Sequence, residues 1–167
     1  MTNFSVAVGF LAALVASNVG VASAQSTPGS IQGVWQAVEV TIPGPTPQTI
    51  RIPEPRANLT ILTARHYSRV QVDSPAPRPA PADITKATAD ELRAAWGPFV
   101  GEAGTYEMGE GNVLTMRPFV AKNPAAMTPG AFTTWTFRLE GNTLWVTARS
   151  NQNGPVDPVT VKVIRVE

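Results

Sequence analysis

Sixteen prolines interrupt this 167-residue chain, and their placement constrains its fold more than any other feature. Nine of them lie in residues 43–55 and 75–81, where each proline removes a backbone hydrogen-bond donor. Such stretches cannot form the central strands of a sheet. Between and after them lie short runs of alternating apolar and polar residues separated by turn residues. This pattern is typical of an all-β sandwich or barrel.

The alternating runs predict eight strands, most of them separated by short stretches of turn residues. We expect these strands near residues 33–42, 58–63, 66–72, 104–108, 113–120, 132–139, 143–149 and 159–166.

The hairpin over residues 132–149 is the best-determined unit because its turn sets its register. Gly141 and Asn142 are residue types that tolerate positive φ in a two-residue turn. Counting back from the turn pairs Leu139 with Leu144, Phe137 with Val146 and Trp135 with Ala148, so that six apolar side chains share one face. We expect this face in the core and the opposite face, where Arg138 opposes Trp145, in solvent.

A second hairpin joins residues 58–63 with residues 66–72. Period-two alternation predicts its buried face as Leu59, Ile61, Val70 and Val72. The same parity places Thr63, His66 and Ser68 on the inward face near one end, and Tyr67, Arg69 and Gln71 on the outward face. The interior wall would therefore be apolar along most of its length and polar near one end.

One short helix is expected within residues 88–97. Thr88 and Glu91 form a capping-box signature, an apolar stripe follows at helical spacing, and Gly97 precedes a proline that stops the helix. A helix of about two turns has no independent stability, so its stripe must dock on the sheet or across an open end. A simple packing role is favoured over a mobile lid.

Residues 1–24 are typical of a signal peptide. They carry no charged side chain, and their apolar run over residues 6–16 is too short for a mature membrane anchor. Ala22 to Ala24 match the small-x-small pattern before a cleavage site, so we expect the mature domain to span residues 25–167. The protein would then be exported, periplasmic or extracellular, without a membrane anchor. The absence of Lys and Arg from this segment leaves an uncleaved form as the alternative.

Charge and residue counts exclude several classes of partner. Lys and Arg exceed Asp and Glu by only one, with no like-charged run, which argues against a nucleic-acid or anionic-membrane partner. Without cysteine there is no disulfide, and with His66 as the single histidine no multi-histidine metal site is available. No glycine-rich phosphate loop precedes a helix, so we expect neither metal nor cofactor.

The motif Gly33-Val34-Trp35 at the start of the first strand resembles the Gly-x-Trp signature of lipocalins. Lipocalin-type barrels cover that tryptophan with a basic residue of the last strand, and Arg165 stands in the matching position. The order of segments 63–68, 96–99, 104–107, 121–124 and 151–155 is also similar to that of small bacterial lipocalin-like domain proteins over residues 31–167. This resemblance implies a closed or nearly closed antiparallel β-barrel of the calycin type, with one short helix and with Gly33, Trp35 and Arg165 in structural roles.

The leading functional hypothesis is a barrel that binds a small, hydrophobic or amphipathic molecule in its interior. Its predicted ligand-binding residues come from the strand faces assigned as inward: Trp35, Ile61, His66, Ser68, Val70, Trp135 and Phe137.

Two other hypotheses remain open. Glu39 shares parity with Trp35, so it would point into the barrel, where it and His66 are the candidate acid–base residues of an isomerase or lyase. Alternatively, a strand twist lets Glu39 reach solvent. The third hypothesis is a non-catalytic envelope interaction module that uses the proline-rich loops.

Overall fold

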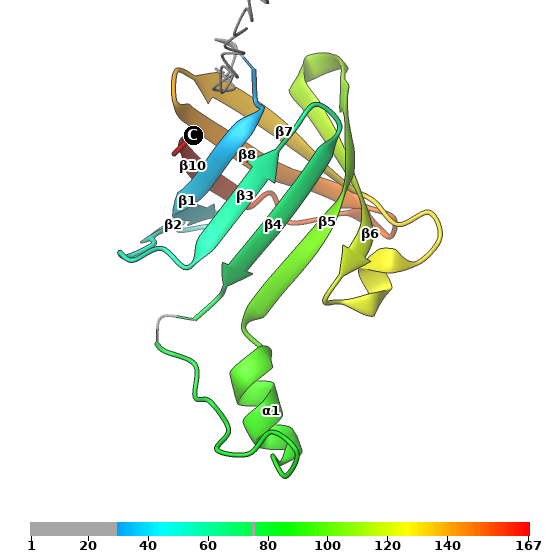
Figure 1. Cartoon of the computed structure of the whole chain (residues 1–167). Helices are drawn as coiled ribbons and strands as arrows, with labels where there is room; N and C mark the ends of the chain where they lie inside the picture. Colours follow the sequence, from blue (N-terminus) through cyan, green and yellow to red (C-terminus); the bar gives the residue numbers. More distant parts are fainter. Residues whose placement is uncertain (1–29, 75) are drawn as a thin grey trace, which may run out of the picture.

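The computed structural model describes residues 30–74 and 76–167 (Figure 1). The expected signal peptide, residues 1–24, and the cleavage site before Gln25 lie outside this part. The elements, in chain order, are β1 (Gly33–Ile42), β2 (Gln48–Arg51), β3 (Asn58–Leu62), β4 (His66–Val72), α1 (Ala89–Trp96), β5 (Phe99–Gly109), η1 (Glu110–Asn112), β6 (Val113–Ala121), η2 (Pro124–Met127), β7 (Thr133–Glu140), β8 (Thr143–Asn151), β9 (Gly154–Pro155) and β10 (Thr160–Arg165).

Eight of these strands form a closed antiparallel barrel, which confirms the predicted fold class. Their order around the barrel is β10-β1-β3-β4-β5-β6-β7-β8, and β10 pairs with β8 to close the circuit. The short strand β2 pairs with the second half of β1 and lies off this path. It occupies part of a stretch predicted as loop. The prolines do not prevent this because none of them lies within the four residues of β2.

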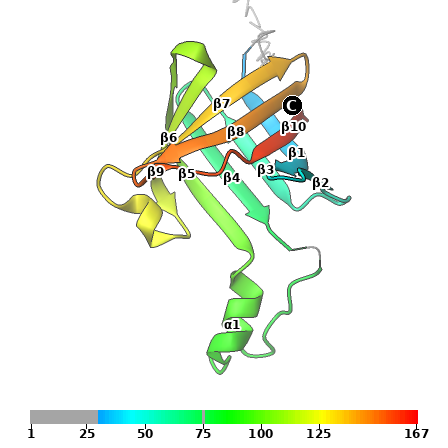
Figure 2. The same cartoon turned by 180° about the vertical axis from the view of Figure 1, so that it is seen from behind.

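The two ends of the barrel differ (Figures 1 and 2). The β3–β4 and β5–β6 turns lie at the end where β1 begins, which we call the Trp35 end. The opposite end, where α1 and η2 lie, is called the helix end. Most of the fully buried side chains form one cluster: Ile31, Trp35, Leu62, Tyr67, Tyr106, Leu114, Met116, Leu144 and Val163.

The β7–β8 hairpin has the register predicted from its turn. Glu140 pairs with Thr143 around a two-residue turn in which Gly141 has φ of 56°. Leu139, Phe137 and Trp135 oppose Leu144, Val146 and Ala148, and this face packs against the core cluster. On the outer face the Arg138 guanidinium lies 3.8 Å from the centre of the Trp145 ring, as predicted.

The β3–β4 hairpin is turned inside out relative to the prediction. Ile61 and Val70 are 39% and 42% exposed, whereas Leu62 and Tyr67 are buried. The cause is the pairing of β3 with β1, in which Trp35 directly opposes Thr60. Paired residues of neighbouring strands share a face, so an inward Trp35 places the even-numbered residues of β3 inside.

A β-bulge changes the facing of β1 halfway along its length. Ala37 pairs with Val163 and Glu39 with Lys162, so Val38 is an extra residue without a partner on β10. After the bulge the parity is reversed, because one inserted residue moves all later side chains to the other face. Glu39 therefore shares the outer face with Lys162, and its predicted inward position is wrong.

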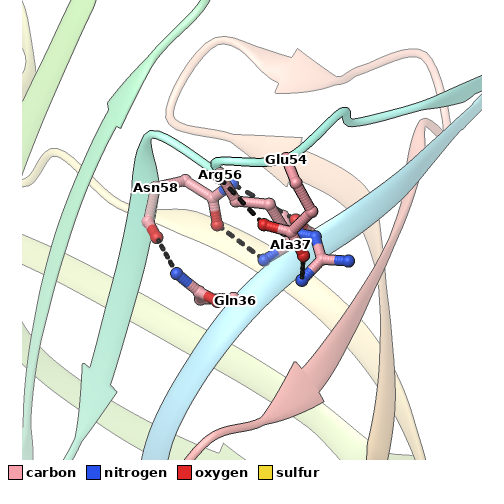
Figure 3. Close-up of polar contacts among 5 residues, drawn as sticks. All are labelled: Gln36, Ala37, Glu54, Arg56 and Asn58. Carbon is pink, nitrogen blue, oxygen red and sulfur yellow. Dashed lines mark hydrogen bonds and ion pairs between the residues drawn. The ribbon is translucent and has the colours of Figure 1, made fainter.

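Asn58 connects β3 to β1 at this bulge (Figure 3). Its side-chain Oδ1 accepts a hydrogen bond of 2.6 Å from the Ala37 N–H, and its Nδ2 donates one of 3.2 Å to the Ala37 carbonyl. The amide group thus replaces a backbone peptide as the partner of Ala37. Gln36 donates to the Asn58 carbonyl at 3.4 Å, and Arg56 forms an ion pair with Glu54 in the preceding loop.

We predict that Asn58→Ala lowers the free energy of unfolding by about 2 kcal/mol, because two partly buried backbone groups of Ala37 lose their partners. Urea denaturation measures this change. The matched control is Asn153→Ala, at an exposed turn position, with an expected change within about 0.5 kcal/mol. Equal losses in the two variants would show that the Asn58 amide does not hold β1 and β3 together.

The helix α1 has the predicted capping box, with the Thr88 side chain accepting from the Glu91 N–H and Glu91 accepting from Thr88. Its predicted docking on the barrel is wrong. Figures 1 and 2 show α1 projecting beyond the helix end, and Trp96 is 49% exposed although Ala95 is buried. The helix is instead held by polar contacts at its C-terminal end, described below.

Candidate functional site

Apolar side chains line the half of the interior that β7, β8 and β10 form. Trp135, Phe137, Val146 and Val161 face inward and pack against the core cluster, yet each is only partly buried. Leu144, which lies closer to the Trp35 end on the same face, is by contrast fully buried. The interior is therefore packed tightly near the Trp35 end and less tightly towards the helix end.

Polar side chains line the opposite wall, on β4 and β5. Arg69 and Glu102 are directly paired across these strands, and their side chains form an ion pair of 3.1 Å. Both side chains are largely buried, with exposed fractions of 28% and 16%. The two strands place them on the inward face because neighbouring Tyr67 and Gly104, also paired, belong to the buried face.

Tyr67 adds a neutral donor beside this ion pair. Burial raises the pKa of the Tyr67 hydroxyl well above its usual range, and the neighbouring Glu102 carboxylate raises it further. The hydroxyl therefore stays protonated at physiological pH. Within the described part of the chain, the Tyr67 hydroxyl and the Arg69 Nε are buried without a hydrogen-bond partner. We call Tyr67, Arg69 and Glu102 the polar cluster.

The two walls face each other across the barrel. In the eight-strand circuit β4 is separated from β8 by three strands in either direction, so the polar cluster lies across the interior from the apolar side chains of β8. A largely apolar space with a few converging polar groups is the usual lining of a small-molecule site.

A pocket lies next to the polar cluster at the helix end. Its volume is about 390 Å³, and Glu102 belongs to its lining. The other lining residues come from the ends of β5 and β6 and from the segment after α1: Gly97, Phe99, Val100, Gly101, Ala121, Lys122 and Asn123. The volume lies within the range of small-molecule sites, roughly 300 to 1,000 Å³.

Lys122 connects the C-terminal end of α1 to the pocket lining through hydrogen bonds. Its ammonium group donates to the carbonyls of Trp96, Gly97 (2.9 Å) and Phe99 (2.8 Å). These carbonyls include the last ones of the helix, which lack partners within it, and a cation there is also favoured by the helix dipole. Arg78 donates to the Ala95 carbonyl at 3.1 Å and adds a second contact.

The Trp35 end is sealed by the residues that the sequence resemblance assigned to it. The Trp35 ring is fully buried, and its Nε1 donates to the Ile31 carbonyl at 2.8 Å. The Arg165 guanidinium lies 4.2 Å from the ring centre and donates to the carbonyls of Gln32 and Ser30. Gly33 leaves room for this arginine, since a Cβ at that position would collide with the Arg165 guanidinium and would lie 2.7 Å from the Glu167 carbonyl oxygen.

Only part of the predicted binding set faces the interior. Trp135 and Phe137 lie on the inner apolar wall, and their contact with a ligand stays a prediction. Trp35 is inside but belongs to the sealed end. The other four residues are on the outer wall of β3 and β4, so their predicted inward facing is wrong: Ile61, His66, Ser68 and Val70.

The structure does not bring Glu39 and His66 together. Glu39 lies six residues beyond Gly33 towards the helix end, whereas His66 follows the turn after Leu62, the partner of Gly33. At the rise of a β-strand this separates the two levels by roughly 20 Å. A shared proton-transfer role needs hydrogen-bond reach or one bridging water, so this acid–base pair is not formed.

Sequence reasoning missed Tyr67 and Arg69 because it faced β4 the wrong way, and it missed Glu102 because the predicted strand began at residue 104 whereas β5 begins at Phe99. Gly104, which opposes Tyr67, could have indicated the correct facing, because an aromatic side chain often covers a glycine on the neighbouring strand. Had Tyr67 been placed inside, period-two alternation would have placed Arg69 there as well.

Among residues 30–74 and 76–167, no cluster of three or more His, Asp or Glu side chains could hold a metal ion. In the same part of the chain, no helix has the length and apolar character needed to cross a bilayer. The chain matches no known family, and no curated protein matches it in sequence.

Proposed function

We propose that this protein is an exported, lipocalin-like barrel that binds a small, largely apolar molecule in the helix-end half of its interior. The observation that carries this proposal is the partial exposure of inward apolar side chains there, Trp135 and Phe137 among them, next to a pocket of about 390 Å³. A polar cluster on the facing wall would orient the molecule. The sealed Trp35 end supplies a rigid base for the site.

The experiment is a titration with N-phenyl-1-naphthylamine, an uncharged apolar dye that becomes fluorescent in apolar surroundings. We predict saturable binding that Trp135→Ala weakens by about tenfold, which corresponds to the loss of about 1.4 kcal/mol of contact. The matched control is Trp145→Ala, on the outer face of the neighbouring strand, where Trp145 contacts Arg138 and Lys162. Dye binding should not change in the control.

Absence of saturable binding by the unchanged protein would overturn the proposal, and so would equal weakening in both variants. Export is tested separately by producing the full chain in a bacterial host and determining the N-terminus of the protein by mass spectrometry. A mature chain that begins at Gln25 supports the export proposal. A cytoplasmic protein that still begins at residue 1 or 2 contradicts it.

A further inference from the structure

The polar cluster carries a charge balance that bears on the kind of molecule the site accepts. Arg69 is the inward-facing cation of β4, and its charge is neutralised by Glu102 at 3.1 Å. The pair is largely buried, where charges are screened less than at the surface. A molecule that enters the site thus meets a neutral ion pair at the cluster. The cation in the pocket lining, Lys122, already donates to three backbone carbonyls, which use the three N–H groups of its ammonium.

The polar cluster has more hydrogen-bond donors than acceptors to pair with them. An arginine has five N–H donors and a tyrosine hydroxyl has one. In the described part of the chain the Arg69 Nε is buried without a partner, and the Tyr67 hydroxyl lies near the Glu102 carboxylate but makes no hydrogen bond of ordinary geometry. A buried donor without a partner is unfavourable, and an acceptor supplied by a ligand removes that cost. The cluster is thus a donor site without net charge.

The pocket connects this donor site to space that a ligand can occupy. Glu102 is the member of the cluster that also belongs to the pocket lining. The rest of the lining is apolar side chains and glycine backbone, together with the polar residues Lys122 and Asn123. A ligand whose chain lies along the apolar wall would bring its polar end towards Glu102 and Arg69.

We infer that the preferred ligand has an apolar body and an uncharged hydrogen-bond acceptor, such as the carbonyl of an ester, ketone or amide, and that Glu102 acts against carboxylates. This inference rests on the proposed function of the barrel. An uncharged carbonyl gains hydrogen bonds from Arg69 and Tyr67 and gives up little hydration. A carboxylate gives up far more hydration on burial, and the repulsion from Glu102 opposes its attraction to Arg69.

The test compares two ligands with the same chain, methyl decanoate and decanoate, by calorimetric titration at neutral pH. We expect the unchanged protein to bind the ester at least about tenfold more tightly than the carboxylate. Glu102→Gln removes the opposing charge and leaves Arg69 free to bind an anion. In this variant the preference should reverse, with decanoate bound more tightly than its ester.

The matched control is Glu107→Gln, which removes the same charge from an exposed position on the same strand. It should keep the preference of the unchanged protein. A double variant, Arg69→Gln with Glu102→Gln, removes both charges, and it should lose most of the difference between the two ligands. Glu102→Gln alone leaves Arg69 buried and unpaired, which can destabilise the barrel. In that case the double variant still allows the two ligand affinities to be compared.

The outcomes separate the inference from the function on which it rests. If neither decanoate, its ester nor the naphthylamine dye binds, the proposed function fails and the inference fails with it. If the unchanged protein binds both decanoyl ligands equally, or prefers the carboxylate, the inference is overturned while interior binding stands. A preference for the ester that persists in Glu102→Gln would show that Glu102 is not the residue that excludes anions.

Discussion

Replacing Trp35 with alanine is expected to lower the free energy of unfolding by about 3–5 kcal/mol, the usual cost of truncating a fully buried tryptophan. Trp35 is almost completely buried at the sealed end, donates to the Ile31 carbonyl and lies under the Arg165 guanidinium. The change removes core volume, one hydrogen bond and the surface that Arg165 covers. Because domains of this size are stable by about 5–15 kcal/mol, this single substitution removes a large share of the total.

Urea denaturation followed by circular dichroism measures the effect, and Trp35→Phe serves as an intermediate variant if the alanine variant does not fold. The matched control is Trp145→Ala on the outer face, with an expected loss under about 1 kcal/mol, because Trp145 contributes a surface cation–π contact. Similar losses at the two positions would contradict the role of Trp35 as the centre of the core.

Gly104→Ala is expected to destabilise the barrel by about 3 kcal/mol, the upper part of the range for overpacking. A Cβ at Gly104 would lie 2.8 Å from the Arg117 carbonyl carbon and from the Pro118 Cα, and it would also collide with the Arg117 carbonyl oxygen. These are backbone atoms of β6, next to the register shift between Ala103 and Gly104. Neither a side-chain rotation nor a small shift relieves the contact, so the strands must separate.

The control for this substitution lies at the end of the same strand. At Gly109 an added Cβ would be 3.8 Å from the Val113 Cβ, which is an ordinary contact, and φ there is −102°. Gly109→Ala should change stability by less than about 0.5 kcal/mol. Because Gly104 opposes Tyr67, dye binding should weaken in Gly104→Ala and stay unchanged in Gly109→Ala. If the two variants had equal free energies of unfolding, β5 and β6 would not approach each other closely at Gly104.

Local signals predicted the elements that depend on neighbours in the sequence. The β7–β8 register follows from Gly141, since a two-residue turn determines the pairs from Glu140–Thr143 to Trp135–Ala148, before the register shifts at Thr134. The capping box of α1 follows from Thr88 and Glu91, which are three residues apart. Both predictions hold because the atoms involved are close along the chain, whatever the rest of the molecule does.

The prediction of which side chains point inward failed on β3 and β4, where both faces of the hairpin carry apolar residues. In β3 and β4 one face carries Leu59, Ile61 and Val70, and the other carries Leu62 and Tyr67. Alternation cannot choose between two partly apolar faces, and the pairing of Thr60 with Trp35 on β1 makes the choice. Tyr67 and Arg69 were missed for this reason, because a facing error of one residue moves every side chain of the strand to the other side.

The sequence by itself determined that this protein is an all-β sandwich or barrel with one capped helix. Those features come from turns, caps and periodicity, which act over a few residues. Closure into a barrel, with Trp35 and Arg165 at one end, was expected only from the resemblance to lipocalin-like proteins. Only the tertiary structure decided that the bulge after Ala37 turns Glu39 outward and that Arg69 and Glu102 meet inside. These outcomes depend on which strands are neighbours, and strand neighbours are chosen by contacts between residues far apart in the chain.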